Sequence, residues 1–275
     1  MKRILYATDL DAHSDRALHR AMMLSIQHDA ELLIFHVTDP RAANAAVRIS
    51  ELEEQIQKSQ LPDISAAKRG ALRHQIKVVS GDPISELVAA VDSFHPDLVV
   101  MGPSRELTPM AVFYGTTADK AVARIGSPIL VVKNRPYALY GKSLVAFDHT
   151  LGSRAALELA AGLAPDAELL IASVTGADGN CLKELNNVND MVSGHVTEIL
   201  KSVPDGKLRD IEPQVTIRSG IAGDELLNCA AQIKPDLLAF GRTQKTGLKS
   251  LVPGSTANLL LGHAACDVLI AGRIG

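Results

Sequence analysis

Cysteine is scarce in this sequence, and the positions of the three cysteines argue against a domain stabilised by disulfides or by zinc. Cys181, Cys229 and Cys266 lie far apart and no C-x-x-C spacing occurs, so neither a disulfide framework nor a zinc site is indicated. We expect Cys229 and Cys266 to be small buried residues. Neither sign of charge dominates, since acids and bases are mixed along the chain and the net charge is −3. Without a basic stripe to bind a phosphate backbone, nucleic acid is not an expected partner.

The N-terminal apolar stretch is short. It runs from Ile4 to Ala7 and meets Thr8-Asp9, which is too few residues for the core of a signal peptide or for a membrane span. We therefore expect a cytoplasmic protein without a membrane partner. Several catalytic motifs are missing as well: Lys245-Thr246 lacks the frame of a P-loop, no G-x-G-x-x-G follows either first strand, and neither G-x-S-x-G nor H-x3-H occurs.

The composition and length that remain suit two globular domains. Apolar residues make up 47% of the chain and charged residues 21%, which is typical of a soluble protein with substantial cores. At 275 residues the chain is long enough for two domains of about 100 to 150 residues each. We expect one domain over residues 1–137 and a second over 138–275, with a short linker near Pro136.

An internal repeat supports this division. Like residues recur at a spacing of 139, the difference between Asp9 and Asp148, from the first predicted strand to the last, except that the second strands align at a spacing of 137. The matching pairs are Ser80-Gly81 with Ser219-Gly220, Glu86-Leu87 with Glu225-Leu226, Pro96-Asp97-Leu98 with Pro235-Asp236-Leu237, Gly102 with Gly241, and Gly115 with Gly254. A register held over this length indicates two copies of one structural unit.

The first copy alternates predicted strands and helices. Strands are predicted over 3–8, 31–38, 75–80, 97–102 and 128–133, and helices over 14–28, 41–72, 83–95 and 115–125. Short runs of Val, Ile and Leu without polar alternation are typical of strands covered on both faces, so the fold class is α/β with a mostly parallel sheet. Ser14 and Ser153 each stand just before an Ala- and Leu-rich stretch and are predicted helix N-caps.

Candidate ligand-binding residues follow the strands. In an open parallel sheet, ligands bind beyond the carboxyl ends of the strands where the strand order reverses. Asp9 and Asp148 each close a first strand, where a carboxylate can accept hydrogen bonds from a ribose hydroxyl or a base amino group. The alternative is that each carboxylate caps its own turn or the next helix, which is common for Asp after a strand.

Glycines mark the ends of the fourth strands. Gly102 and Gly241 follow these strands, and Gly115-Thr116 and Gly254-Ser255 come 13 residues later, before a helix. A glycine lets a phosphate approach the backbone, while free N–H groups and the positive end of a helix favour an anion. The alternative is a glycine turn followed by a Ser or Thr N-cap, with no ligand.

These residues together make the sequence resemble the universal stress protein family, whose ATP-binding members carry G-x2-G-x9-G-[ST] after the fourth strand and an Asp after the first. The resemblance covers essentially the whole chain, twice. It implies two tandem Rossmann-like domains of the adenine nucleotide alpha hydrolase-like type, each a five-stranded mostly parallel sheet flanked by helices. It also implies that the two domains pack as an intramolecular pseudo-dimer through strands 129–132 and 268–270, and it leaves a further homodimer of two chains open.

The resemblance further implies a ligand, an adenine nucleotide (ATP, ADP or AMP, with or without magnesium). The residues implied to hold it are Asp9 and Asp148 at the ribose and base, Val37 and Val174 offering backbone groups to adenine, and Gly102, Gly115 and Thr116 with Gly241, Gly254 and Ser255 at the ribose and phosphates. We find no positioned general base beyond the Asp pair. The expected function is therefore stress-response signalling through nucleotide binding, with at most slow ATP hydrolysis and with no catalytic or metal-ligating residue.

Both copies depart from the family pattern at its second glycine, where Arg105 and Gln244 stand. In the family this glycine lies under the phosphates, so a side chain obstructs them, although Arg105 can instead pair with phosphate charge. The second copy keeps Gly247 in a basic loop, whereas the first has the stiff Pro103 and the bulky Phe113, so we expect the second site to be the better one. The alternative function is a nucleotide-independent stress-response scaffold or interaction protein with degenerate sites.

Overall fold

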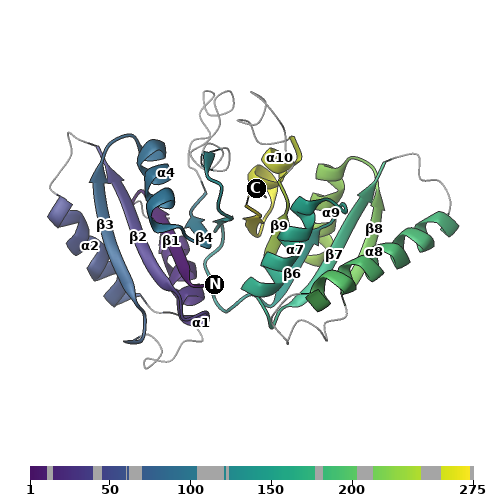
Figure 1. Ribbon diagram of the computed structural model, residues 1–275, viewed down its shortest axis with the longest axis horizontal. Helices are drawn as coiled ribbons and strands as arrows, with labels where there is room; N and C mark the ends of the chain where they lie inside the picture. Colours follow the sequence, from purple (N-terminus) through teal and green to yellow (C-terminus); the bar gives the residue numbers. More distant parts are fainter. Residues whose placement is uncertain are drawn as a thin grey trace. The chain divides into compact units, whose positions relative to one another are not determined.

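The structure, a computed structural model, divides into two compact units, Met1–Leu139 and Tyr140–Gly275 (Figure 1). It describes residues 1–10, 15–39, 45–59, 61, 70–103, 121, 124–176, 182–202, 213–242 and 255–272. Both units consist of parallel strands with helices between them, which confirms the predicted α/β class.

The elements follow one another in the predicted alternating order. The first unit contains β1 (Arg3–Thr8), α1 (Asp15–Gln27), β2 (Glu31–Thr38), α2 (Ala45–Lys58), β3 (His74–Ser80), α4 (Pro83–Phe94), β4 (Leu98–Met101) and β5 (Ile129–Val131). The second contains β6 (Lys142–Ala146), α7 (Leu151–Leu163), β7 (Glu168–Thr175), α8 (Leu182–Ser202), β8 (Gln214–Ser219), α9 (Ala222–Ile233), β9 (Leu237–Phe240), α10 (Ser255–His263) and β10 (Asp267–Ile270).

The strand order is the same in both units. It runs β3-β2-β1-β4-β5 in the first and β8-β7-β6-β9-β10 in the second, and the neighbouring strands within each unit pair in parallel. The chain therefore moves outward from the first strand of each unit to one edge, then returns to its other side. This reversal falls between β1 and β4 and between β6 and β9.

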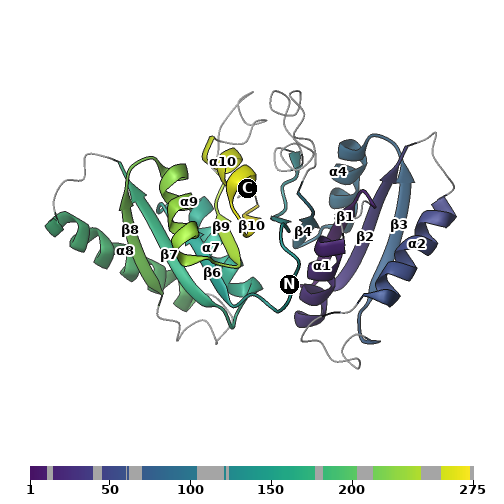
Figure 2. The ribbon, with the colours of Figure 1, turned by 180° about the vertical axis from the view of Figure 1, so that it is seen from behind.

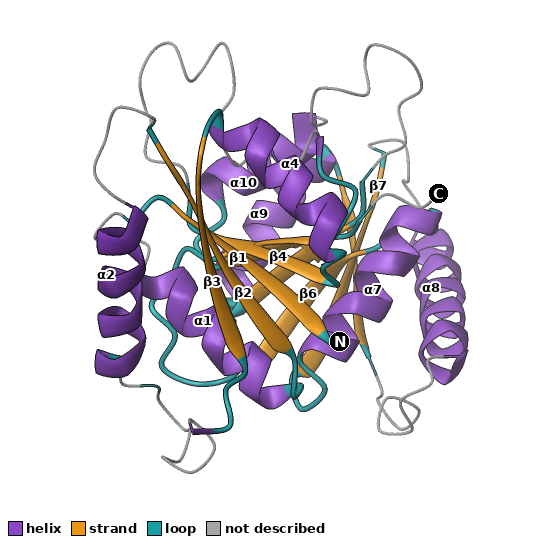
Figure 3. Cartoon of the chain, turned by 60° about the vertical axis from the view of Figure 1, so that its left-hand side comes forward, coloured by secondary structure: helices purple, strands orange, loops and turns teal. Residues whose placement is uncertain are grey.

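Helices cover both faces of each sheet. Figures 1 and 2 show α1 and α2 on one face of the first sheet and α4 on the other, and α7 and α8 on one face of the second with α9 and α10 on the other. Figure 3 shows the twist of the first unit's strands between these helices. The central strands are accordingly apolar, and every residue of β4 and β9 is buried. In the described part of the chain, no helix combines the length and apolar character needed to cross a bilayer.

Several repeated residues have a structural explanation. The Asp236 carboxylate accepts hydrogen bonds from the backbone N–H groups of Gly141 and Lys142, each at 2.9 Å, and so ties the start of β9 to the start of β6. Asp97 makes the same bonds to Lys2 and Arg3 at the start of β1. The repeated Pro-Asp-Leu segments thus fix the end of each sheet that lies away from the candidate site.

A second repeated feature is a glycine beneath a glutamate. A Cβ added at Gly81 would lie 2.7 Å from the Glu86 carboxylate, and one at Gly220 would lie 3.1 Å from the Glu225 side chain. The Ser-Gly and Glu-Leu pairs of the repeat therefore recur together because the glutamate packs over the glycine. Cys229 and Cys266 are buried, as predicted.

One of the two predicted helix N-caps, Ser153, is wrong. Thr150, and not Ser153, is the N-cap of α7, because the Ser153 N–H donates to the Thr150 hydroxyl at 3.2 Å. Ser153 lies inside the first turn and is buried. The chain turns sharply after β6, so the helix begins three residues earlier than the Ala-rich pattern indicated. The other predicted N-cap, Ser14, lies outside the described residues.

Candidate functional site

The fold brings the repeated Asp and Gly positions to neighbouring strand ends. Asp9 follows β1 and Gly102 follows β4, and these two strands pair directly, with Ala7 opposite Met101. Asp148 and Gly241 follow β6 and β9, which also pair directly. Both Asp–Gly pairs therefore stand at the carboxyl ends of strands on either side of the point where the strand order reverses, which is the usual ligand position in this kind of sheet.

The two valines lie at the same level of the sheet. The last registered pair of β1 and β2 is Thr8 with His36, so Asp9 and Val37 are the next residues along both strands. Val37 is half-buried within β2, and Val174 is half-buried within β7. The structure thus places one Asp, one Val and one Gly of each unit at the carboxyl ends of three adjacent strands.

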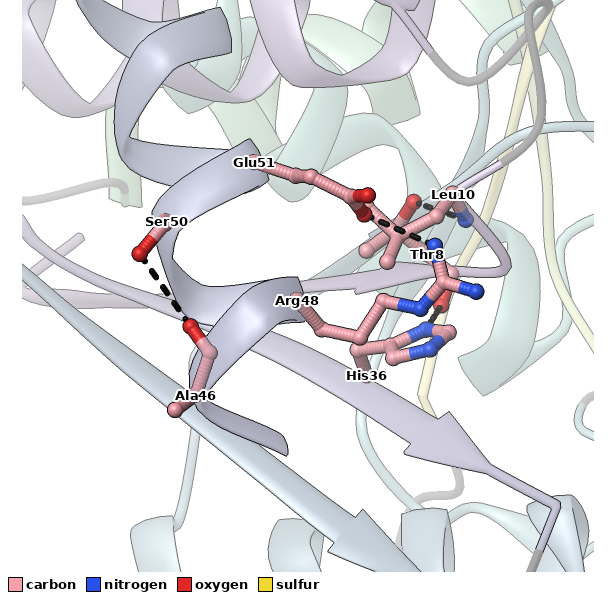
Figure 4. A network of polar contacts seen from close by, with 7 residues as sticks. All are labelled: Thr8, Leu10, His36, Ala46, Arg48, Ser50 and Glu51. Atoms are coloured by element: carbon pink, nitrogen blue, oxygen red, sulfur yellow. Dashed lines mark hydrogen bonds and ion pairs between the residues drawn. The ribbon is translucent and has the colours of Figure 1, made fainter. Parts of the chain in front are cut away.

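In the first unit, a histidine holds the strand end beside Asp9. His36 is buried, with 6% of its surface exposed, and its Nδ1 lies 2.8 Å from the Thr8 carbonyl oxygen. Leu10 donates its N–H to the Thr8 hydroxyl at 3.0 Å (Figure 4). The ion pair Arg48–Glu51 of α2 extends toward this strand end in the same view, with 2.7 Å between its charged atoms. Asp9 itself is exposed.

In the second unit, the Asp148 carboxylate is part of a hydrogen-bonded turn. Its Oδ1 accepts a bond from the Thr150 hydroxyl at 2.6 Å and one from the Thr150 N–H at 3.2 Å. The Asp148 N–H donates to the Ser153 hydroxyl at 3.3 Å. The carboxylate therefore shapes the entry into α7, which is the capping role that the sequence analysis kept as its alternative. The same group is still exposed at the strand end.

These contacts keep Asp148 charged. Partial burial raises the pKa of its carboxyl, but the hydrogen bonds from Thr150 and with Ser153 outweigh burial, so that the pKa lies below its ordinary value. At neutral pH this strand end consequently presents an anionic acceptor. Such a group suits the hydroxyl and amino donors of a ligand and repels a phosphate.

Gly241 makes the tightest backbone contact of the site. A Cβ added to it would lie 2.1 Å from the Gly152 carbonyl carbon and 2.4 Å from the Ser153 nitrogen, in the first turn of α7. A Cβ on Gly152 would in turn lie 2.7 Å from the Arg242 carbonyl oxygen. Strand β9 and helix α7 therefore touch backbone to backbone, and this packing requires glycine at position 241 whether or not a ligand is bound.

An aromatic cluster that the sequence patterns did not predict lies around Asp148. Phe147 is 2% exposed, and its ring lies edge-on to the rings of His149 and His195, with centroid distances of 5.0 and 5.6 Å. The Nδ1 atoms of His149 and His195 are 2.9 Å apart. In the sequence, His149 can be noticed because it directly follows the candidate Asp. His195 lies 46 residues further along, on α8, so no local pattern could link the two.

The remaining predicted site residues belong to the second part of each glycine motif. Gly115, Thr116 and Gly254 lie outside the described residues. Ser255 is the first residue of α10, so a helix does begin directly after Gly254, as the motif predicts. Among the residues that the structure describes, no group of three or more His, Cys, Asp or Glu side chains is arranged to hold a metal ion.

The comparisons with known proteins agree with the two-unit architecture. The universal stress protein family matches residues 1–133 and again residues 139–272. Universal stress protein E of Escherichia coli (strain K12) is 23% identical over 213 residues, which are 71% of this chain and 67% of that protein. A universal stress protein from Thermus aquaticus is 27% identical over 135 residues, 48% of this chain and 98% of that protein.

A solved structure matches over the full length. The crystal structure of a universal stress protein from Archaeoglobus fulgidus DSM 4304 has a TM-score of 0.68 at 19% identity, and the match covers 99% of this chain and 98% of that one. This likeness supports the fold, and the two family matches span nearly all of the sequence. The chain belongs to the universal stress protein family and is a tandem member with two such domains.

Proposed function

We propose that this chain is a cytoplasmic stress-response protein that binds an adenine nucleotide (ATP, ADP or AMP) at the carboxyl ends of the strands of its second unit, without dedicated catalysis. The observation that carries the proposal is the placement of Asp148, Val174 and Gly241 on adjacent strand ends beside the reversal of strand order. In the proposed complex, Asp148 accepts from the ribose or the base, and backbone groups near Val174 contact adenine. The start of α10 at Ser255 supplies free N–H groups for phosphate.

The second unit is favoured over the first by the way its Asp carboxylate is anchored. The Asp148 carboxylate is held by Thr150 and Ser153 in one orientation, so little conformational entropy is lost when a ligand binds. In the first unit, Pro103 stands directly after Gly102, and the motif continues into Arg105. Slow ATP hydrolysis is compatible with this site, where the Asp carboxylate is the candidate general base.

A second candidate function is a scaffold or interaction protein that needs no nucleotide. One observation favours it: the site residues of the second unit already have structural roles, since Asp148 completes the turn before α7 and Gly241 permits the contact of β9 with α7. Both positions would be required for folding even if no ligand were bound. The replacement of the second motif glycine by Arg105 in one copy and Gln244 in the other also favours this function.

Calorimetric titration of nucleotide-stripped protein with ATP, ADP and AMP, with and without magnesium, separates the two functions. The informative variants are Asp148→Asn and Asp148→Ala, because Asn keeps the oxygen that accepts from Thr150 and removes only the charge. Asp9→Asn is the matched control at the repeated position in the first unit.

We expect micromolar binding that Asp148→Asn weakens and Asp9→Asn leaves unchanged. If binding is present but insensitive to both variants, the ligand occupies another place and the assignment of Asp148 is wrong. If no heat develops and no nucleotide competes at millimolar concentration, the scaffold function replaces the proposal. Gln244→Gly then tests for obstruction, since an obstructed site gains affinity when that side chain is removed.

A further inference from the structure

The contact between His149 and His195 is a hydrogen bond between two imidazole rings. Their planes differ by only 14°, and the Nδ1 atoms are 2.9 Å apart while the ring centroids are 5.2 Å apart. Because the two nitrogens are so much closer than the centroids, the rings meet edge to edge, with each Nδ1 pointing at the other. This is the geometry of an N–H···N bond, in which one Nδ1 carries the hydrogen and the other accepts it.

The number of protons on the pair decides whether this bond exists. When both rings are neutral, one donates and one accepts. When one ring is protonated, its Nδ1–H still donates to the neutral ring and the bond gains charge assistance. When both rings are protonated, each Nδ1 carries a hydrogen and a positive charge faces a positive charge, so the bond is lost. The contact is therefore stable with zero or one extra proton and breaks with two.

The pair holds the loop that contains Asp148. The residues on both sides of Asp148 touch His195, since Phe147 contacts its ring edge-on at 5.6 Å and His149 bonds to it. His149 also has a φ of 61°, a left-handed conformation that most residues avoid and that surrounding contacts must maintain. Loss of the His195 contact therefore removes a restraint on the turn from β6 into α7.

The charged groups around the pair set the pH at which this happens. Burial and the neighbouring His195 lower the pKa of His149 below its ordinary value of 6.5, and the carboxylate of Asp148 acts in the opposite direction. On α7, Arg154 forms an ion pair with Glu158 at 2.9 Å and donates to the Ser202 hydroxyl of α8 at 3.4 Å. A His with a lowered pKa resists protonation in the folded state, so the contact is complete above about pH 6.5 and is lost only at lower pH, once both rings carry an extra proton.

We propose that the edge-to-edge contact of His149 with His195 is a proton-operated latch, which holds the Asp148 loop against α8 at neutral pH and releases it on acidification. Its effect on ligand binding rests on the proposed function, because Asp148 is the residue assigned to the nucleotide. The first unit lacks the latch, since Leu10 occupies the position equivalent to His149 and has nearly the same backbone conformation, with a φ of 59°.

Hydrogen exchange on the full chain tests the latch without any ligand. Protection factors, which correct for the pH dependence of intrinsic exchange, are measured at pH 7.5 and pH 4.5 for the amides of residues 148–153 and 194–197. We expect protection there to fall by about tenfold or more on acidification through local opening, while the amide of Leu10 in the first unit is unaffected. Nitrogen-15 spectra of the imidazoles at pH 7.5 should show one ring with a protonated Nδ1 and the other with a protonated Nε2.

His195→Gln is the matched variant. A glutamine amide can donate to a neutral His149 or accept from a protonated one, so the contact survives at both pH values and the pH dependence of protection disappears. His195→Ala should lower protection at both. His19 also has a lowered pKa, and it is present in the wild type and in both variants. Any pH-dependent change in protection that His19 causes is therefore common to all three proteins and cancels when they are compared.

The outcomes separate the latch from the proposed function. A wild-type protein whose protection at 148–153 is the same at both pH values, or whose pH dependence persists in His195→Gln, overturns the latch. A parallel titration with ADP at both pH values should show affinity falling on acidification in the wild type more than in His195→Gln, with the ligand's own titration common to both. Absence of ADP binding at every pH refutes the proposed function, while the exchange data still decide the latch.

Discussion

Replacement of Gly241 by alanine adds one methyl group where β9 meets the first turn of α7. The Cβ would lie 2.1 Å from the Gly152 carbonyl carbon, whereas carbon atoms in contact are normally about 3.5 to 4.0 Å apart. The neighbouring atoms belong to the backbone and have no rotamer through which they can move away. Helix and strand must therefore separate by about 1.5 Å at this point, which also displaces Ser153 and the turn that it helps to form.

The cost follows from this separation. Inserted methyl groups in well-packed cores typically cost about 1–3 kcal/mol, and more where the surroundings cannot yield. We expect at least about 3 kcal/mol for Gly241→Ala, because the contact is between two backbones. With about 3–5 °C per kcal/mol for a unit of this size, the melting temperature of the second unit should fall by roughly 10 °C.

Scanning calorimetry of the full chain measures this change, with the transition of the first unit as an internal reference, since two units need not unfold in one step. Gly194→Ala is the matched control: Gly194 lies exposed within α8 with no atom of the described residues near its added Cβ, so alanine should stabilise the helix by about 1 kcal/mol. If Gly241→Ala melts within about 1 °C of the wild type, the close contact of β9 and α7 is not a constraint and the structural explanation of this glycine is wrong.

Three further changes have defined outcomes. Ile221→Asp should raise the melting temperature of the second unit by about 3 °C, because Ile221 is the N-cap of α9, is 73% exposed and makes no capping bond; calorimetry against Ile221→Ala checks it. Tyr140→Phe should cost about 2 kcal/mol, measured as a lower urea midpoint at unchanged slope, because the buried Asp267 carboxylate loses a 2.7 Å hydrogen bond. Thr150→Ala should raise the pKa of Asp148, measured by carbon-13 NMR, and should reduce the stability that this carboxylate contributes at neutral pH and loses on acidification below about pH 4, whereas Thr150→Ser should change neither.

The order of strands and helices could be predicted because it depends on local pattern. The apolar runs that become β1, β2 and β4 have no polar alternation, and such runs are typical of strands with helices on both faces. The repeat, at a spacing of 139 for most of its length, extended that prediction to the second unit without new assumptions. Asp9 and Asp148 could be placed at strand ends for the same reason, since a strand's last residue follows from where its apolar run stops.

The details of the site depend on contacts that no local pattern records. Thr150, not Ser153, caps α7 because the chain turns through a left-handed residue, His149, immediately after Asp148. The sequence shows two hydroxyl residues near the helix start and does not reveal which one the turn will bring to the free N–H. The bond of His149 to His195 and the backbone contact of Gly241 with Gly152 join segments far apart in the chain, so spacing rules do not detect them.

The two units make the same hydrogen bonds at the starts of their strands but differ beside the candidate site. Asp97 and Asp236 bind the same backbone positions in both copies, whereas the residues flanking the candidate Asp are Thr8 and Leu10 in one unit and Phe147 and His149 in the other. The first strand end is fixed by a buried His36 bonded to a backbone carbonyl, a contact that does not require a second titrating group. The second is fixed by two imidazoles that share a hydrogen. The anchoring of the first strand end therefore does not depend on a pair of histidines, whereas the anchoring of the second depends on the protonation of His149 and His195. Acidification should accordingly release the loop of Asp148 in the second unit and leave Asp9 in place.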